Sequence, residues 1–366
     1  MPFNDTIGRG DLGDVLMPDQ VINDIIAEAP KSSVILARAA RARLSSKKAK
    51  QPVLTTLPEA FWVNGDTGLK QTTKSQWENV YITAEEIAAL VPIPDAVIDD
   101  ASVPLWDQIK PLLAEAVGKT VDLAALFGIN KPDSWPAAVV PESIRRGNAV
   151  AAGTGKDFGV DVAKVGELVS LDGYGVNGFA SAPGLQWRLV GLRSDQGVPI
   201  YTPSLAEGTP SGLYGYPLNE ALNGSWQSYA DLFGADWTKF VVGIRQDITY
   251  KLLDQAVITD ADGKVIFNAP QQDSQILRVV MRVGFQTALP MTRVNSDRGS
   301  AYPAGTVLSA GAAKAKSTDY LVGDFVTEGG HVYEVTTAGT TGTTAITAPG
   351  VGNTVTDGTA VLTQRV

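Results

Sequence analysis

The chain has 366 residues, of which 44% are hydrophobic and 19% charged, with a formal net charge of −9. This composition excludes wholesale disorder, and the length predicts two or three domains. The absence of cysteine excludes disulfide bonds and thiolate chemistry. No apolar run reaches the ~20 residues of a membrane-spanning helix, and the N-terminus lacks the pattern of a secretory signal. We therefore expect a product that stays in the cell that makes it.

Charge is unevenly distributed near the N-terminus. Residues 1–30 carry six acidic side chains against Arg9, and then no acid occurs between Glu28 and Glu59. Basic side chains fill that gap: Lys31, Arg38, Arg41, Arg43, Lys47, Lys48 and Lys50. The strings VINDIIAEAP and SSVILARAARARL have helical spacing, which predicts an extended arm over 1–50 with one or two short helices. Charge alone leaves open whether this arm binds a partner or is merely solvated.

Residues 51–82 have the pattern of a long β-hairpin. The runs VLTTL and AFWV are strand-like, NGDTG supplies a turn, and QTTKSQWENVYIT is typical of the returning strand. A two-stranded excursion of this kind has too little core to hold itself in place. It needs a surface to lie on.

One amphipathic helix follows the hairpin. Pro92 and Pro94 exclude a long helix over 83–98, whereas Ser102 can cap a helix that runs to Phe127, with Gly128 as its stop. Pro111 lies inside this helix and predicts a kink.

The rest of the chain predicts mixed α/β structure and then a small β domain. Residues 158–175 indicate a helix and a turn, and 185–203 indicate strand, turn and strand. The runs FVVGIRQDITYKLLDQ, KVIFN and SQILRVVMRVGFQTAL are typical of strands. Residues 298–318 are rich in small side chains and predict a linker, and 319–366 predict a separate β domain.

Several strings imitate catalytic or metal-binding motifs. GTGKD, at 153–157, lacks the first glycine and the magnesium-binding hydroxyl of a phosphate-binding loop. DFG, at 157–159, stands without the rest of a kinase signature, and TDADGK, at 259–264, is better explained as a hairpin turn than as a calcium loop. His331 is the only histidine. We therefore expect no enzyme, no cofactor and no metal site.

The order of arm, hairpin, amphipathic helix, α/β region and closing strands resembles the major capsid proteins of tailed double-stranded-DNA bacteriophages. The strings that carry the resemblance span about 50–295: Trp77–Gly128, LVGLRSDQGVPIYTPS, Leu213–Asn219, WTKFVVGIRQDITYKLLDQ and Ile276–Val294. The resemblance implies an α+β, Hong Kong 97-like phage capsid fold. Its parts would be an N-terminal arm (1–50), an extended loop (51–82), a peripheral domain with spine helix (83–128 and 276–297), an axial domain (129–275), a linker (298–318) and a β domain (319–366) on the outer surface.

The same resemblance implies a structural role. Copies of the chain would form pentamers and hexamers of an icosahedral or prolate shell around the phage genome, with a portal protein and a scaffolding protein as further partners. The extended loop would contact a neighbouring subunit through Trp62, Asn64, Lys70, Lys74 and Trp77. The arm would lie at the inner surface, where Arg38, Arg41, Arg43, Lys47 and Lys48 would face packaged DNA or acidic patches of adjacent subunits.

The sequence departs from the family in two places. The chain reaches the hairpin by about residue 52, so we expect no cleaved scaffolding segment, and any scaffold would be a separate protein. The type member joins a hairpin lysine to an asparagine of the next subunit. Here Asp273 stands near where that asparagine is expected, so we predict no covalent cross-link through Lys70 or Lys74.

The terminal domain resembles small β modules of phage and carbohydrate-active proteins. Tyr320, Phe325 and Tyr333 would either stack on a surface glycan or form the core of the domain. The alternative function is accordingly a soluble glycan-binding or adhesive protein. If the chain is a shell protein, we expect that a chain without 303–366 still assembles into shells.

Overall fold

A computed structural model describes residues 33–64, 68–101, 104–155, 157–191, 212–260, 262–309 and 312–366. The chain divides into two compact units. Among the described residues, one unit contains 91–112 and 252–277, and the other contains 33–90, 113–251 and 278–366. The helix expected over 21–30, the Ser102 cap and most of the strands expected over 185–203 lie outside the described residues.

The basic arm begins with a helix of five residues and continues as a strand. Helix α2 (Val34–Arg38) is capped by Ser33, and strand β1 (Ala40–Arg43) pairs in parallel with β10 (Phe240–Leu253). The expected helix over the whole of this segment was therefore wrong after Arg38. Backbone pairing with a distant strand outweighs the local helical spacing, because a strand edge supplies hydrogen-bond partners that sequence spacing does not reveal.

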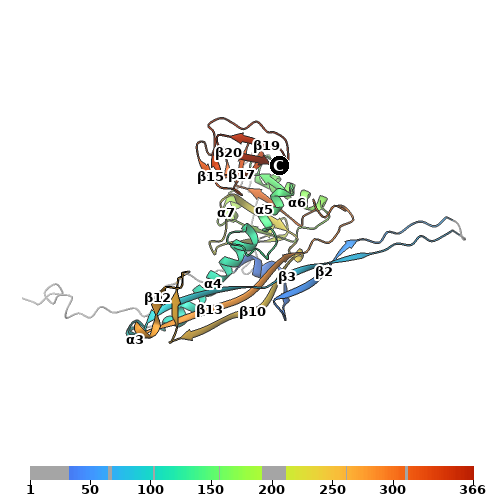
Figure 1. Cartoon of the computed structure of the whole chain (residues 1–366). Helices are drawn as coiled ribbons and strands as arrows, with labels where there is room; N and C mark the ends of the chain where they lie inside the picture. Colours follow the sequence, from blue (N-terminus) through green and yellow to red (C-terminus); the bar gives the residue numbers. More distant parts are fainter. Residues whose placement is uncertain are drawn as a thin grey trace, which may run out of the picture. The chain divides into compact units, whose positions relative to one another are not determined.

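The predicted hairpin is confirmed, with a shorter ladder than expected. Strands β2 (Lys48–Thr56) and β3 (Gln76–Thr83) are antiparallel from Lys48↔Thr83 to Thr56↔Gln76. The run AFWV, expected to be a strand, is irregular. Figure 1 shows β2 and β3 at the base of a long, thin excursion.

The amphipathic helix is confirmed. Helix α4 (Leu105–Asp122), with Pro111 inside it, continues as the π-helix η1 (Leu123–Phe127) and stops at Gly128, whose φ of 80° is the left-handed conformation that glycine adopts most easily. No long helix occupies 83–98. Strand β4 (Glu85–Pro94) and the short helix α3 (Asp95–Asp100) stand there.

Two larger sheets organise the chain. The four-stranded sheet has the order β1-β10-β13-β4, and the six-stranded sheet has the order β5-β14-β9-β6-β8-β7. The strands not yet introduced are β5 (Ala149–Ala151), β6 (Gly178–Ser181), β7 (Gly212–Leu213), β8 (Tyr216–Glu220), β9 (Ala230–Ala235), β13 (Ser274–Thr287) and β14 (Ala304–Leu308). Helices α5 (Val139–Arg145) and α6 (Phe158–Leu171) contact β14, and the latter confirms the helix expected over 158–175.

Strand β14 overturns the expected linker over 298–318. All five residues of β14 are buried, and the strand lies between β5, to which it is parallel, and β9, to which it is antiparallel. Small side chains at Ala304 and Gly305 are typical of a loop, yet here they let neighbouring elements approach closely: a Cβ on Gly305 would lie 2.9 Å from Val165. A chain that lacks 303–366 would lose an inner strand of the six-stranded sheet.

A second correction concerns the segment after residue 184. The run LQWRLV, expected to be a strand, is helix α7 (Leu185–Val190). Leu185 and Leu189 are buried four residues apart, which is helical spacing, whereas Trp187 between them is exposed. A run of six residues is too short for hydrophobic spacing to distinguish a strand from a helix.

Two 3-10 helices and one further hairpin complete the part of the body that the structure describes. The 3-10 helices η2 (Trp237–Lys239) and η3 (Ala269–Gln271) flank β10 and β13, and the hairpin consists of β11 (Val257–Thr259) and β12 (Val265–Asn268). The turn of the hairpin contains TDADGK, as predicted: Asp260 accepts hydrogen bonds from the backbone of Asp262 and Lys264.

The C-terminal region is all-β, as expected. Its strands are β15 (Asp319–Tyr320), β16 (Phe325–Glu328), β17 (His331–Thr337), β18 (Gly339–Thr340), β19 (Thr354–Asp357) and β20 (Ala360–Gln364), and four of them form a sheet of order β16-β17-β20-β19. A small core joins Val326, Tyr333, Val335 and Leu362. Phe325 and Val332, however, belong to the main core that also contains Phe127 and Phe240. The β region therefore packs on the body and shares its core.

Candidate functional site

The base of the β2–β3 hairpin is fastened to the end of β13 and to the segment that follows it. Gln286 donates a hydrogen bond to the Tyr81 carbonyl over 2.9 Å, and Arg298 forms an ion pair with Glu78 at 2.9 Å. Nearer the tip, Arg293 donates to the carbonyl of Pro58 over 2.8 Å. These contacts fix the direction in which the hairpin leaves the body.

The far part of the hairpin is bare. Every described side chain in 58–64 and 69–74 is exposed, which includes Asn64, Lys70 and Lys74. Trp62 and Leu69 are almost completely exposed, at 101% and 94%, and Trp77 on β3 is 66% exposed. A soluble protein rarely leaves several large apolar side chains in water on one thin ribbon unless a partner covers them.

Covering these side chains supplies a driving force for association. Burial of one large apolar side chain contributes about 1.5–3 kcal/mol. None of the described side chains between Pro58 and Lys74 is buried, so this part of the ribbon cannot provide that burial itself. The sequence-based prediction that Trp62 and Trp77 contact a neighbouring subunit would supply such a cover, and it stays a prediction.

The structure separates the five basic residues of the arm into two groups. Three contact another side chain: Arg38 donates to Asn219 over 2.9 Å, Lys47 pairs with Glu85 at 3.3 Å, and Lys48 lies 4.2 Å from the centre of the Tyr81 ring. Arg41 and Arg43 are exposed, although Arg41 also donates to the Leu36 carbonyl.

Arg41 and Arg43 line one basic groove. The groove has a volume of about 500 Å³, and Arg245 of β10 joins them there, with Asp247 as the single acidic neighbour. Sequence inspection could not include Arg245, because parallel pairing of β1 with β10 brings it to the arm from about 200 residues away. Three guanidinium groups against one carboxylate favour an anionic partner.

The glycan expectation fails for two of its three aromatic residues. Phe325 and Tyr333 are 4% and 1% exposed, so neither can stack on a sugar ring. Both are core residues, which is the alternative that the sequence left open. Tyr320 is partly buried and lines a groove of about 800 Å³ together with Tyr229.

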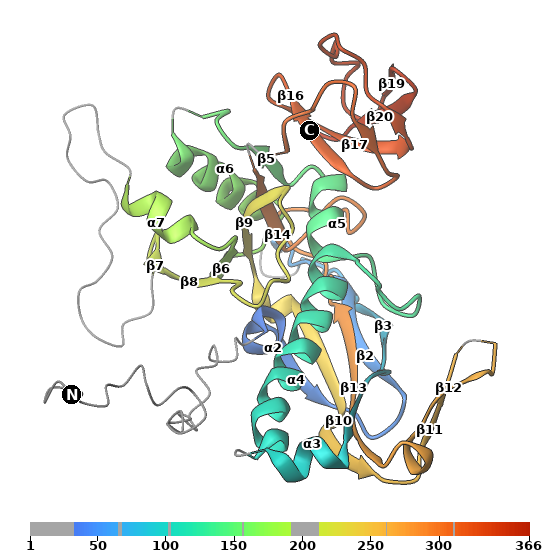
Figure 2. The ribbon, with the colours of Figure 1, turned by 90° about the vertical axis from the view of Figure 1, so that its left-hand side faces the viewer.

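A carboxylate couples the β region to the body. Glu334 of β17 accepts two hydrogen bonds from Arg145 of α5, at 2.8 and 3.2 Å, and one from Arg365 at 3.0 Å. Burial acts to raise the pKa of Glu334, but the two guanidinium groups outweigh it and hold that pKa below its usual value. Figure 2 shows α5 beside the β16 and β17 strands, and the Phe325 ring packs on Tyr229 at 5.5 Å.

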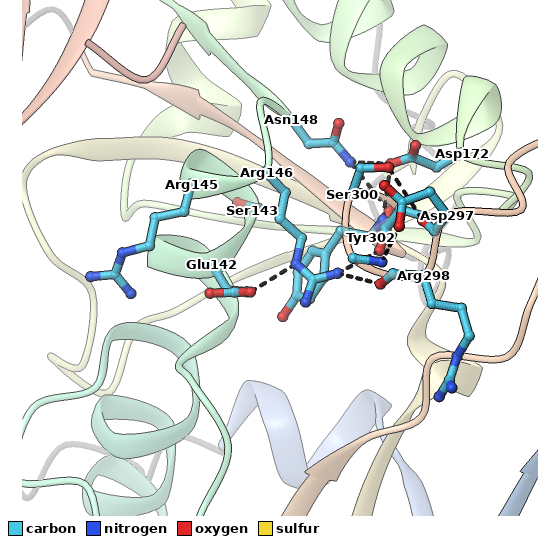
Figure 3. Close-up of polar contacts among 12 residues, drawn as sticks. Glu142, Ser143, Arg145, Arg146, Asn148, Asp172, Asp297, Arg298, Ser300 and Tyr302 are labelled. Carbon is cyan, nitrogen blue, oxygen red and sulfur yellow. Dashed lines mark hydrogen bonds and ion pairs between the residues drawn. The ribbon is translucent and has the colours of Figure 1, made fainter. Parts of the chain in front are cut away.

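The neighbouring arginine holds the segment that leads into β14. Figure 3 shows Arg146 turned away from Arg145 towards Glu142 and Tyr302. Its guanidinium pairs with Glu142 at 2.7 Å and donates to the carbonyls of Arg298 and Ala301. This network positions the strand that the sequence did not predict.

A buried acid that the sequence analysis missed fixes the start of the arm. Asp122 of α4 is fully buried and accepts hydrogen bonds from the Ser33 hydroxyl at 2.6 Å, from the backbone of Val34 and Ile35 at 3.0 Å, and from Asn223 at 2.7 Å. Burial raises the pKa of Asp122, and the four hydrogen bonds offset part of that rise. The available signal was an acid on the apolar face of the predicted helix.

In the GTGKD string, which resembles a phosphate-binding loop, two backbone N–H donors are already occupied by a carboxylate of helix α6. Asp161 of α6 accepts hydrogen bonds from the backbone N–H groups of Gly153 and Gly155, at 2.8 and 2.7 Å. A phosphate would compete with this carboxylate for the same donors. Asp157, of the DFG string, caps α6 through the backbone of Val160.

Neither a membrane span nor a metal cluster is found in the part of the chain that the structure describes. None of its helices is both long and apolar enough to cross a bilayer. Within the same residues, His, Asp and Glu side chains form no group of three that could hold a metal ion.

This chain is similar to known proteins in sequence and in fold. Residues 13–291 match the family described as "Phage capsid family". A major capsid protein of Staphylococcus phage 80alpha is 24% identical over 291 residues, which cover 78% of this chain and 86% of that protein. Among solved structures, a chain from Microbacterium phage Oxtober96 has a TM-score of 0.73 and 32% identity, with 83% of this chain and 100% of that chain covered.

A second solved chain, from Mycobacterium phage Cain, has a TM-score of 0.71 and 31% identity, and covers 83% of this chain and 99% of its own length. The fold is therefore that of the tailed-phage shell proteins, an α+β, Hong Kong 97-like fold with an added C-terminal β region. The chain belongs to the phage capsid family. It is a capsid protein and a structural component of the virion.

Proposed function

We propose that copies of this chain assemble as pentamers and hexamers into a closed shell around a phage genome. The observation that carries the proposal is the β2–β3 hairpin, which is fastened at its base and leaves Trp62, Leu69 and Trp77 exposed. Apolar groups on a ribbon without a core gain stability only when another surface covers them. A neighbouring copy supplies that surface once in every subunit, so that modest contacts add up around a symmetric shell.

The division into arm, extended loop, peripheral domain, axial domain and C-terminal β domain is part of this proposal. In it the hairpin lies on the adjoining subunit, and Asn64, Lys70 and Lys74 make polar contacts at its edges. The interface is non-covalent. The chain acts as a structural protein, and the portal opening and any scaffold are formed by other proteins.

The test is assembly of the purified chain and of a hairpin variant, Trp62→Ser with Trp77→Ser. Negative-stain microscopy and size-exclusion chromatography should find shells or rings of five and six for the unaltered chain. The variant should stay largely unassembled, while its subunit melts at an unchanged temperature because both side chains are already in water. Val351→Ser, which changes a 68% exposed apolar residue of the β region, is the matched control. Equal shell yields from the hairpin variant and the control would contradict the proposal.

The groove of Arg41, Arg43 and Arg245 is the second surface in this proposal, and packaged DNA is its partner. Phosphate contacts of this kind are independent of base sequence and weaken steeply with salt. Arg41→Gln with Arg43→Gln should lower the affinity of assembled particles for double-stranded DNA and flatten its salt dependence. Unchanged DNA binding together with weaker assembly would instead assign the groove to acidic patches of a neighbouring subunit.

A further inference from the structure

A buried lysine stands at the start of the C-terminal β region. The side chain of Lys314 is 1% exposed, and its ammonium lies 3.0 Å from Asp357 and 3.4 Å from Glu328. It also donates to the Thr344 carbonyl over 2.7 Å. The three partners come from the end of β19, the end of β16 and the loop between β18 and β19, so one amine meets two carboxylates from separate parts of the sheet.

The reacting groups are held in place by their surroundings. The Glu328 carboxylate accepts a hydrogen bond from the backbone of Ile346 at 2.9 Å. The Asp357 side chain is 6% exposed and lies so close to Gly342 that a Cβ there would be 2.6 Å from its Oδ1. Fixed groups at contact distance react far faster than the same groups free in solution, because their entropy of approach is already lost.

Two features of the β region weaken it: burying these three charges is costly, and the surrounding core is small. Removing a cation and two anions from water costs several kcal/mol for each ion. The core of the β region that surrounds them is limited to a few side chains, and the chain has no cysteine with which to brace it. A neutral covalent link between two of the groups would remove both weaknesses.

We propose that Nζ of Lys314 and Cγ of Asp357 join in an intramolecular isopeptide bond. The Nζ–Cγ bond forms, the Cγ–Oδ2 bond breaks, and Oδ2 leaves in one molecule of water. Glu328 takes two protons in turn from the nitrogen, one before the attack and one after it, and passes each to the departing oxygen, so that Glu328 ends unchanged and the amide keeps one N–H. The sum is an ammonium and a carboxylate converted to an amide and water, with no oxidant, reductant or cofactor.

Glu328 is needed because the amine starts protonated. Burial acts to lower the pKa of Lys314, but the hydrogen bond to Asp357 and the charge of Glu328 raise it, and the net pKa lies above its usual value. An ammonium is not a nucleophile, so a nearby base must accept its proton before attack. The expected reaction is therefore slow, of the kind that follows folding.

The water that forms has a way out. A cleft of about 380 Å³ borders Lys314 and Glu328 and is lined on its other sides by residues 151–154, 329 and 330. The bond would close a ring of the chain from the first residues of the β region to its last hairpin. The inference concerns the folded subunit and does not depend on shell assembly.

Mass spectrometry of the full-length purified chain tests the inference. The intact mass should be lower than the sequence requires by one water molecule, and a proteolytic digest should yield one branched peptide that joins Lys314 to Asp357. Lys314→Arg and Asp357→Ala should each restore the full mass, and Glu328→Gln should leave most of the chain unlinked. Lys316→Arg, on an exposed neighbouring lysine, should keep the loss of water.

The unaltered chain decides the matter even where a variant fails to fold. A full intact mass with separate Lys314 and Asp357 peptides would overturn the proposal. A lost water that maps to any other pair of residues, including Lys314 with Glu328, would overturn it as well.

Discussion

Arg145 and Glu334 are 189 residues apart in the sequence, and their side chains meet through paired hydrogen bonds, the shorter of 2.8 Å. Because Arg365 binds the same carboxylate, Glu334 joins the body, β17 and the C-terminal end of the chain. The β region is therefore fixed to the body by a charged contact as well as by the shared core around Phe325. An appendage on a free linker would need neither.

We predict that Glu334→Gln lowers the free energy of unfolding by about 1.5–3 kcal/mol, the range for a hydrogen bond to a charged group. The single side-chain oxygen of glutamine cannot accept from both guanidinium groups. The amide NH2 would then face the N–H donors of Arg145 or Arg365. Chemical denaturation followed by fluorescence would measure the loss. Asp133→Asn, on an exposed carboxylate, should change stability little. A Glu334→Gln chain as stable as the control would contradict the coupling role.

The same contact predicts a pH dependence. The pKa of Glu334 is lowered from its ordinary value of 4.5, so its ionised form contributes stability that is present above about pH 4.5. That contribution is lost as the pH falls through the lowered pKa. The difference in melting temperature between the unaltered chain and Glu334→Gln should thus be constant near neutral pH and shrink in acid. A difference that grows in acid would show the opposite linkage.

Two truncations should distinguish the contribution of β14 to folding from that of the β region. A chain without 303–366 loses an inner strand of the six-stranded sheet, and we expect it to be insoluble or unfolded. A chain that ends at Ala312 keeps β14 and should fold, with a lower melting temperature because the surface around Tyr229 is uncovered. Expression yield, circular dichroism and thermal melting distinguish the two. Equal folding of both chains would mean that β14 is dispensable.

The hydrogen bonds of Asp122 predict how firmly the arm is attached to helix α4. Asp122→Ala leaves the buried donors of Ser33, Val34 and Ile35 without an acceptor, and each such donor costs about 1–3 kcal/mol. We expect a strongly destabilised chain whose arm is cut early in limited proteolysis. Ser33→Ala removes one of these contacts and should have a smaller effect. In a double-mutant cycle the two changes should be non-additive, because they share a hydrogen bond.

Elements whose pattern extends over many residues could be predicted from the sequence. The helix that ends at Gly128, the hairpin from β2 to β3, helix α6 and the strands of the C-terminal region all follow from periodicity and turn residues. The exposed Trp62 and Trp77 could be predicted too, because a two-stranded ribbon has no interior in which to hide them.

Short segments were decided by distant partners. Ala40–Arg43 is a strand because β10 offers it an edge, and Ala304–Leu308 is a strand because β5 and β9 lie on either side. The same holds for single residues: Arg245 joins the basic groove, Asp122 caps α2, and Lys314 meets Asp357 only after the chain has folded.

The sequence by itself determined the order of the main elements and the exposed hairpin, because local hydrophobic spacing and turn chemistry act over a few residues. Tertiary structure alone decided which short runs became inner strands and which charges became buried. Backbone hydrogen bonding and desolvation depend on partners far along the chain, and these appear only when the chain is packed.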